Sequence, residues 1–90
     1  MLYIITMKNI FEYNSYKKFL HDLILSQGRG AVSHLAKAAG CNRTYLSQVL
    51  NSKVQLTADH IYGIADYVGF TSEEQDFLIL LLHYERSANR

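Results

Sequence analysis

The chain is short of the residues that mark several classes of protein. It has no proline, and its single cysteine, Cys41, has no partner for an internal disulfide bond. A disulfide framework is therefore excluded, and a lone thiol agrees with a reducing cytoplasm. Because proline cannot occupy the interior of a helix, its absence fits a chain made mostly of helices joined by short turns.

Long hydrophobic runs are also missing. The longest strongly apolar run, Phe77 to Leu82, is far shorter than the ~20 residues that span a bilayer. Met1 to Met7 is apolar, but it lacks the basic start, the length and the small-residue cleavage site of a signal peptide. The sequence therefore predicts a cytoplasmic protein without a membrane-spanning helix.

Length and charge narrow the fold and its partners. With 90 residues, of which 49% are hydrophobic, the chain can bury one core but has no room for a second. The net charge of +1 conceals a basic half and an acidic half: residues 1–53 carry seven Lys or Arg and two acidic residues, whereas residues 54–90 carry two and six. This asymmetry suits a domain that presents one face to a polyanion.

Hydrophobic periodicity and punctuation predict an all-α fold of five helices. The first begins after Asn14 or Ser15, ends at Gly28, and has one apolar face formed by Tyr16, Phe19, Leu20, Leu23 and Ile24. Its wet side is expected to carry Lys17, Lys18, His21 and Asp22. A short alanine-rich helix over residues 31–39 follows, and Gly40 closes it.

The remaining three helices follow from caps as well as from periodicity. Asn42 is expected to cap a helix over residues 43–50, and Thr57 a helix that Gly69 ends. The fifth helix covers residues 72 to about 86. Two overlapping capping boxes mark its start, Thr71 with Glu74 and Ser72 with Gln75.

We expect residues 1–10 to form an apolar arm ahead of the domain, which covers residues 11–90. Leu2, Tyr3, Ile4 and Ile5 favour an extended strand. A lone strand on a helical domain needs a partner, and a second subunit is one candidate. The alternatives are an arm packed on its own domain and a poorly ordered end.

Residues 32–51 carry the pattern of two helices joined by a tight turn. Ala36 is small enough for a close helix crossing, and Gly40 tolerates the positive φ of the turn. The inward positions are apolar, namely Leu35, Ala39, Cys41, Leu46 and Val49. The outward positions are polar, namely Asn42, Arg43, Thr44, Ser47, Gln48 and Asn51.

This spacing resembles the helix-turn-helix signature of Cro/repressor-type (Xre-like) regulators. The similarity continues through Thr57, Ile61, Ile64, Ala65, Val68, Gly69 and Phe70, so that it covers residues 32–70. More loosely, the aromatic series Phe11, Tyr13, Tyr16 and Phe19 is similar to the opening of a group of longer bacterial regulators. The resemblance implies a lambda-repressor-like DNA-binding domain.

It also implies which residues contact double-stranded DNA. In such proteins the second helix of the unit lies in the major groove. The base-contacting positions are then Asn42, Arg43, Thr44, Ser47 and Gln48, and the phosphate-contacting positions are Ser33, Asn51 and Lys53. Arg43 suits guanine and Gln48 suits adenine. Val32 stands where the family often has Gln, and Tyr45 is a larger residue than usual, which shields the backbone or packs sideways.

No residue pattern points to chemistry. The four histidines, at positions 21, 34, 60 and 83, are dispersed, and none has the spacing to Cys, Asp or Glu that a zinc site needs. There is no glycine-rich phosphate loop and no nucleophile elbow. Cys41 takes an inward position as a small apolar residue. The sequence predicts no enzyme, no cofactor, no metal and no small-molecule ligand.

The fifth helix is apolar around its full circumference from Phe77 to Leu82, which is more than one buried face requires. We expect Phe77, Leu80, Leu81 and Tyr84 to face the core. Leu78 and Leu82 would then meet another subunit. A homodimer suits palindromic operators with half-sites about 34 Å apart. The alternative is that the N-terminal arm covers the second face.

The sequence therefore predicts a sequence-specific DNA-binding regulator, a repressor-like protein that acts as a dimer. Two other classes remain open. The chain can be a protein-interaction module, such as an antitoxin-like partner, or a structural helical domain that binds no nucleic acid.

Overall fold

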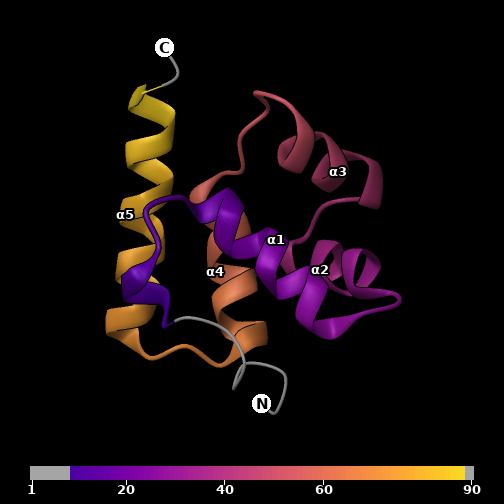
Figure 1. Cartoon of the computed structure of the whole chain (residues 1–90), viewed down its shortest axis with the longest axis horizontal. Coiled ribbons are helices and arrows are strands. Elements are labelled where there is room, and N and C mark those ends of the chain that lie inside the picture. Colours follow the sequence, from indigo (N-terminus) through magenta and orange to yellow (C-terminus); the bar gives the residue numbers. More distant parts are fainter. Residues whose placement is uncertain (1–8, 89–90) are drawn as a thin grey trace.

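Residues 9–88 are the part of the chain that the computed structural model describes, and their regular structure is all helical (Figure 1). A short 3-10 helix, η2 (Ile10–Glu12), precedes five α-helices: α1 (Tyr16–Gln27), α2 (Ala31–Ala39), α3 (Arg43–Asn51), α4 (Ala58–Val68) and α5 (Ser72–Ala88). The predicted all-α fold of five helices is confirmed for this range. The strand expected at Leu2–Ile5 lies outside the described residues.

Helices α1, α3 and α4 begin at predicted caps. The Ser15 hydroxyl accepts a hydrogen bond from the Lys18 N–H at 3.3 Å, and Asn42 Oδ1 accepts one from the Tyr45 N–H at 2.7 Å. Thr57 caps α4 in the same way. Each bond satisfies an N–H group that has no partner in the first helical turn, which is why local sequence defines these starts so closely.

Helix α5 shows one of the two capping boxes predicted for it. The Thr71 N–H donates to Glu74 Oε1 at 2.8 Å, and the Glu74 N–H donates to the Thr71 hydroxyl at 3.2 Å. The second box, Ser72 with Gln75, is wrong. Ser72 is already the first residue of the helix, so the Gln75 N–H donates to the Thr71 carbonyl at 2.9 Å. The helix also extends past residue 86, to Ala88.

Helices α2 and α4 cross closely at Gly63. A Cβ atom placed on Gly63 would lie 3.1 Å from the carbonyl carbon of Ala38 and 3.3 Å from the Cα of Ala39. Only glycine allows the two backbones to approach to this distance. Ala36, the small residue expected at a crossing within residues 32–51, is buried as well.

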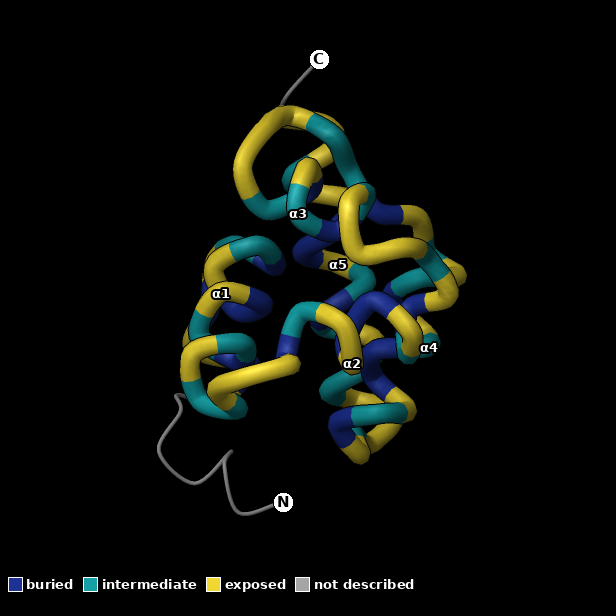
Figure 2. The backbone as a smooth tube through the Cα atoms, turned by 90° about the vertical axis from the view of Figure 1, so that its right-hand side faces the viewer, coloured by how far each residue is buried: buried dark blue, intermediate teal, exposed yellow. Residues whose placement is uncertain are grey.

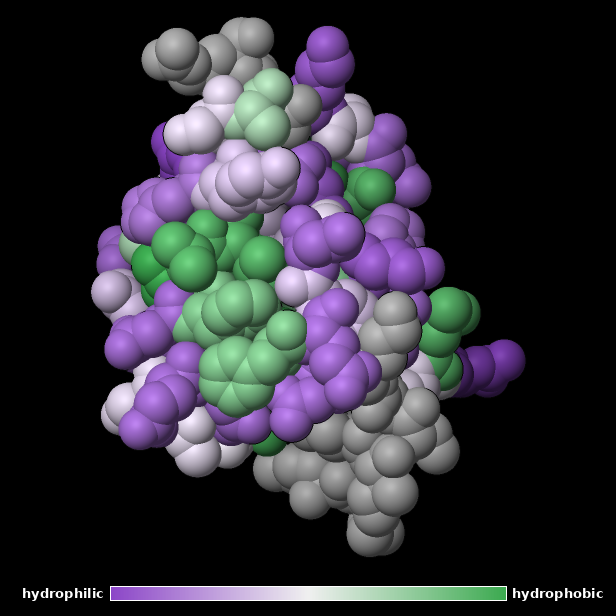
Figure 3. Space-filling view, turned by 60° about the vertical axis from the view of Figure 1, so that its left-hand side comes forward, coloured by the Kyte–Doolittle hydropathy of each residue, from purple (hydrophilic) through white to green (hydrophobic). Residues whose placement is uncertain are grey.

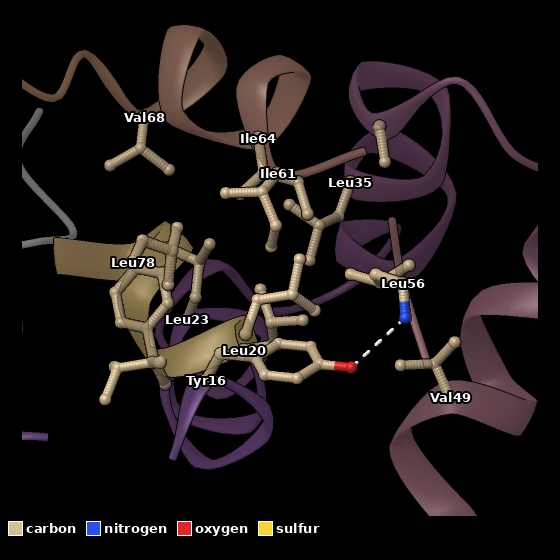
Figure 4. Packing of buried hydrophobic residues seen from close by; sticks show 14 of the residues in the cluster. Tyr16, Leu20, Leu23, Leu35, Val49, Leu56, Ile61, Ile64, Val68 and Leu78 are labelled. Atoms are coloured by element: carbon tan, nitrogen blue, oxygen red, sulfur yellow. Dashed lines mark hydrogen bonds between the residues drawn. The ribbon is translucent and has the colours of Figure 1, made fainter. Parts of the chain in front are cut away.

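One core joins all five helices and the loop after α3, and Figure 4 shows its centre. Its fully buried large side chains are Tyr16, Leu20, Leu23, Leu35, Leu46, Val49, Leu56, Ile61, Ile64, Leu78 and Leu82. The tyrosine keeps its polar end satisfied, because its hydroxyl accepts a hydrogen bond from the Leu56 N–H at 3.1 Å. A buried polar group without a partner would destabilise the fold, so this bond helps to accommodate a tyrosine here.

The inward face of α5 differs in part from the expected one. Leu81 lies in the core and Phe77 packs partly against it, as expected, but the other positions differ. Leu78 and Leu82 are completely buried within the chain, so the prediction that they form a dimer interface is wrong. With Leu81 they make the i, i+3, i+4 stripe that packs on the core. Leu80 and Tyr84, expected in the core, are 60% and 66% exposed.

No helix in residues 9–88 is long and apolar enough to cross a membrane.

The outer face of α5 forms an apolar groove with Tyr13 and Asn14, the residues that follow η2. Exposed Leu80 and Tyr84 lie beside Phe77, whose ring centre is 5.2 Å from that of half-exposed Phe11. The groove encloses about 410 Å³, and Figure 3 shows the hydrophobic patch on this side of the molecule. Contiguous exposed apolar surface of this kind is typical of interaction sites.

Candidate nucleic-acid interface

A three-residue turn, Gly40 to Asn42, joins α2 to α3. Gly40 has φ +84°, which L side chains rarely adopt, and glycine reaches it without steric cost. The Gly40 N–H donates to the carbonyls of Ala36 and Lys37 at 3.0 and 3.2 Å, and the Cys41 N–H donates to that of Ala36 at 3.0 Å. These bonds satisfy the free carbonyls at the end of α2 and fix where α3 begins.

Helix α3 has a buried side and an open side. Leu46 and Val49 are fully buried against the core, and Cys41 in the preceding turn packs partly against it. Burial raises the pKa of the Cys41 thiol, which suits the small apolar role predicted for it. Figure 2 shows exposed and buried residues in turn along α3.

The predicted base-contacting residues lie together on the open side of α3. Arg43, Thr44 and Gln48 are exposed, and Ser47 is partly exposed between them. Positions four apart face the same side of a helix, which aligns residue 43 with 47 and residue 44 with 48. Within residues 9–88, the Arg43, Thr44 and Gln48 side chains make no hydrogen bond or ion pair, so their polar groups are available to a ligand.

Asn42 caps α3, a structural role that Arg43, Thr44 and Gln48 do not have. Its Oδ1 accepts the Tyr45 N–H at 2.7 Å, so only its Nδ2 group is available to a ligand. The cap also holds the start of α3, which places Arg43 in the first helical turn. The N-terminus of a helix carries a partial positive charge, which favours the approach of an anion at this end.

Along the chain, the predicted phosphate-contacting residues lie before α3, at its end and after it. Ser33 is exposed on α2, and Lys53 is exposed in the loop after α3. Asn51 is exposed too, but it is the last residue of α3 rather than a residue beyond it. Its Nδ2 donates to the Ser47 carbonyl at 2.9 Å, which leaves part of the amide for a second partner.

Tyr45 packs sideways, as its size indicates. Its hydroxyl donates to the Gln55 carbonyl at 2.6 Å, and its ring centre lies 5.6 Å from that of His60 on α4. The Gln55 side chain in turn accepts a hydrogen bond from the Tyr16 hydroxyl at 2.6 Å. Burial is the main reason why the pKa of Tyr16 rises to about 12. The open side of α3 therefore stays clear of the large aromatic residue.

Lys17 is the residue whose place the sequence does not reveal. It was expected on the wet side of α1, but its Nζ donates to the carbonyls of Ser52 and Val54 at 2.8 and 2.9 Å. Lys18 matches the expectation: it is exposed, with Asp22 4.0 Å away. Because the partners of Lys17 are backbone groups 35 and 37 residues distant, no side-chain motif could signal the contact.

Exposed basic residues lie at α3 and in the loop after it, and exposed acidic residues lie at the start of α5. Arg43 and Lys53 belong to α3 and the loop that follows it, whereas Glu73 and Asp76 are exposed on α5. Helices α3 and α5 lie on opposite sides of the molecule (Figure 1).

Among residues 9–88 there is no group of three or more His, Cys, Asp or Glu side chains that could hold a metal ion.

Comparison of the chain with protein-family models, with curated proteins and with solved structures finds no match.

Proposed function

We propose that the protein is a sequence-specific DNA-binding regulator of the cytoplasm. Helices α2 and α3 form its helix-turn-helix unit in a lambda-repressor-like domain, and α3 enters the major groove. One observation carries the proposal: Arg43, Thr44 and Gln48 share an exposed face and have no partner within residues 9–88. A helix of this kind fits the width of the major groove of B-DNA.

Each exposed residue has a role that its chemistry favours. The guanidinium of Arg43 donates in a fork to O6 and N7 of guanine, and the amide of Gln48 pairs with N6 and N7 of adenine. Thr44 and Ser47 contact a base edge or a nearby phosphate, and Asn42 adds its free Nδ2. The phosphate backbone is held by Ser33, Asn51 and Lys53, which lie before and after the base-contacting set.

Replacement of Arg43 tests the proposal. Duplexes selected from a random DNA pool supply a binding site, and fluorescence anisotropy then measures Kd at low salt. Arg43→Ala is expected to raise Kd by about tenfold, because a bidentate contact with a base contributes ~1–3 kcal/mol to discrimination. Affinity of the parent should also fall steeply as salt rises, because phosphate contacts release counterions.

Arg43→Lys is the matched control for charge. It keeps the positive charge but loses the planar fork, so affinity for unrelated duplexes should stay near that of the parent while preference for the selected site falls. A parent protein that selects no sequence and binds no duplex at low salt would refute the proposal. So would an Arg43→Ala variant with the affinity and preference of the parent.

We propose further that the regulator acts as a homodimer. The apolar groove on the outer face of α5 supports a different interface from the one expected. Leu80 and Tyr84 present the exposed face that Leu78 and Leu82 do not. A symmetric dimer places the same patch of both subunits in contact.

The dimer is tested by placing charge in this groove. Leu80→Glu combined with Tyr84→Glu should halve the mass measured by light scattering, because buried unpaired carboxylates oppose association. Leu25→Glu is the control, since Leu25 is 80% exposed on α1 and is expected to leave the mass unchanged. If the double variant keeps the parent's mass, the second subunit does not bind here.

A further inference from the structure

Side chains from α1, α3 and α5 hold the loop between α3 and α4. The Tyr45 hydroxyl binds the Gln55 carbonyl, and Arg86 of α5 donates to the Leu56 carbonyl at 3.1 Å. From α1, Tyr16 accepts the Leu56 N–H, as Figure 4 shows. These bonds reach a segment with no regular secondary structure, whose backbone groups would otherwise have only water as a partner.

Lys17 makes the most distinctive of these contacts. Its Nζ binds the carbonyls of Ser52 and Val54, which are the residues on either side of Lys53. Two charge-assisted hydrogen bonds from one ammonium group restrict the backbone of the intervening residue. The side chain of Lys53 itself remains exposed.

Lys17 is also withdrawn from solvent. The residue is half-buried, and burial lowers the pKa of its ammonium group. With both carbonyls bound to its Nζ, little of its donor capacity remains for a phosphate. Lys17 is therefore a basic residue beside the candidate interface that binds the protein's own backbone.

We propose that Lys17 is a positioning residue for DNA binding, which fixes the direction in which Lys53 meets the phosphate backbone by holding the carbonyls of Ser52 and Val54. The inference rests on the proposed function. It assigns Lys17 no contact with DNA and makes its effect depend on Lys53.

A double-mutant cycle tests this dependence, with anisotropy read at several salt concentrations. Lys17→Met should weaken binding by about tenfold, within the range by which residues that touch no ligand can alter affinity. Lys53→Ala should lower the salt slope by about one. Because both changes remove the same phosphate contact, the double variant should bind no more weakly, and with no smaller slope, than the weaker single variant.

Lys18→Met is the matched control, since it removes the same charge from the adjacent position. Lys18 pairs with Asp22 and has an exposed side chain, so its loss should change affinity less than about twofold. Lys17→Arg should restore most of the affinity, because a guanidinium can also donate to two carbonyls. Circular dichroism at the assay temperature confirms that each variant is folded.

Amide hydrogen exchange gives a readout that needs no DNA. In Lys17→Met, exchange should quicken at Val54, whose N–H donates to the Ser52 hydroxyl, and at Leu56, but not in Lys18→Met. Unchanged exchange would overturn the inference, and so would additive effects of Lys17 and Lys53 on affinity. A parent that binds no DNA overturns the proposed function and the role of Lys17 with it.

Discussion

Replacing Gly63 by alanine is expected to lower the free energy of unfolding by about 2 kcal/mol. In an exposed helix the same change would raise it by about 1 kcal/mol, since alanine is the better helix former. Here the new Cβ would meet Ala38 and Ala39 of α2 at backbone atoms, which cannot rotate away. Overpacking of this kind costs ~1–3 kcal/mol or more, so the collision outweighs the gain in helix propensity.

Urea denaturation followed by circular dichroism measures this effect. Tyr62→Ala is the control in the same helix, because Tyr62 is 47% exposed and surface substitutions usually change stability by ~0.5 kcal/mol or less. A Gly63→Ala variant as stable as the parent would mean that α2 and α4 do not approach this closely.

Replacing Leu78 by alanine is expected to cost about 2–5 kcal/mol, whereas Leu80→Ala should cost less than about 1 kcal/mol. The two residues are the same type, lie two positions apart in α5 and differ in burial: Leu78 is fully buried and Leu80 is 60% exposed. The cost at Leu78 comes from lost apolar burial and from the cavity left in the core.

Guanidinium denaturation of both variants at one protein concentration checks this difference. The concentration should be low enough for light scattering to show monomers, because Leu80 lies in the proposed dimer interface. If Leu80→Ala proved the more damaging variant under these conditions, the face of α5 originally predicted to meet the core would be correct.

Helix bounds could be predicted because their causes are local. Ser15, Asn42, Thr57 and Thr71 each bond an N–H group within three residues, so the signal lies in a short stretch of sequence. The inward face of α5 could not be predicted in this way. Its residues from Phe77 to Leu82 are all apolar, so periodicity offers no preferred face and the choice depends on the other helices.

The candidate site also contains features that the sequence could predict and features that it could not. The open side of α3 follows from the helical spacing of its polar and apolar residues, so the exposure of Arg43 and Gln48 could be predicted. The contacts of Lys17 could not, because they depend on the tertiary placement of a loop. Gly63 gave no signal either, since nothing in its own helix shows which backbone it meets.

The lack of internal bonds from side chains on the open side of α3 affects which substitutions the fold tolerates. Because Arg43, Thr44 and Gln48 contribute no internal bond within residues 9–88, exchanging them removes no interaction that holds this part of the chain together. Asn42 is the exception, since its replacement must still cap the helix. Three positions can therefore be varied at little risk to folding, so the face that we propose binds DNA can be altered without disturbing the core.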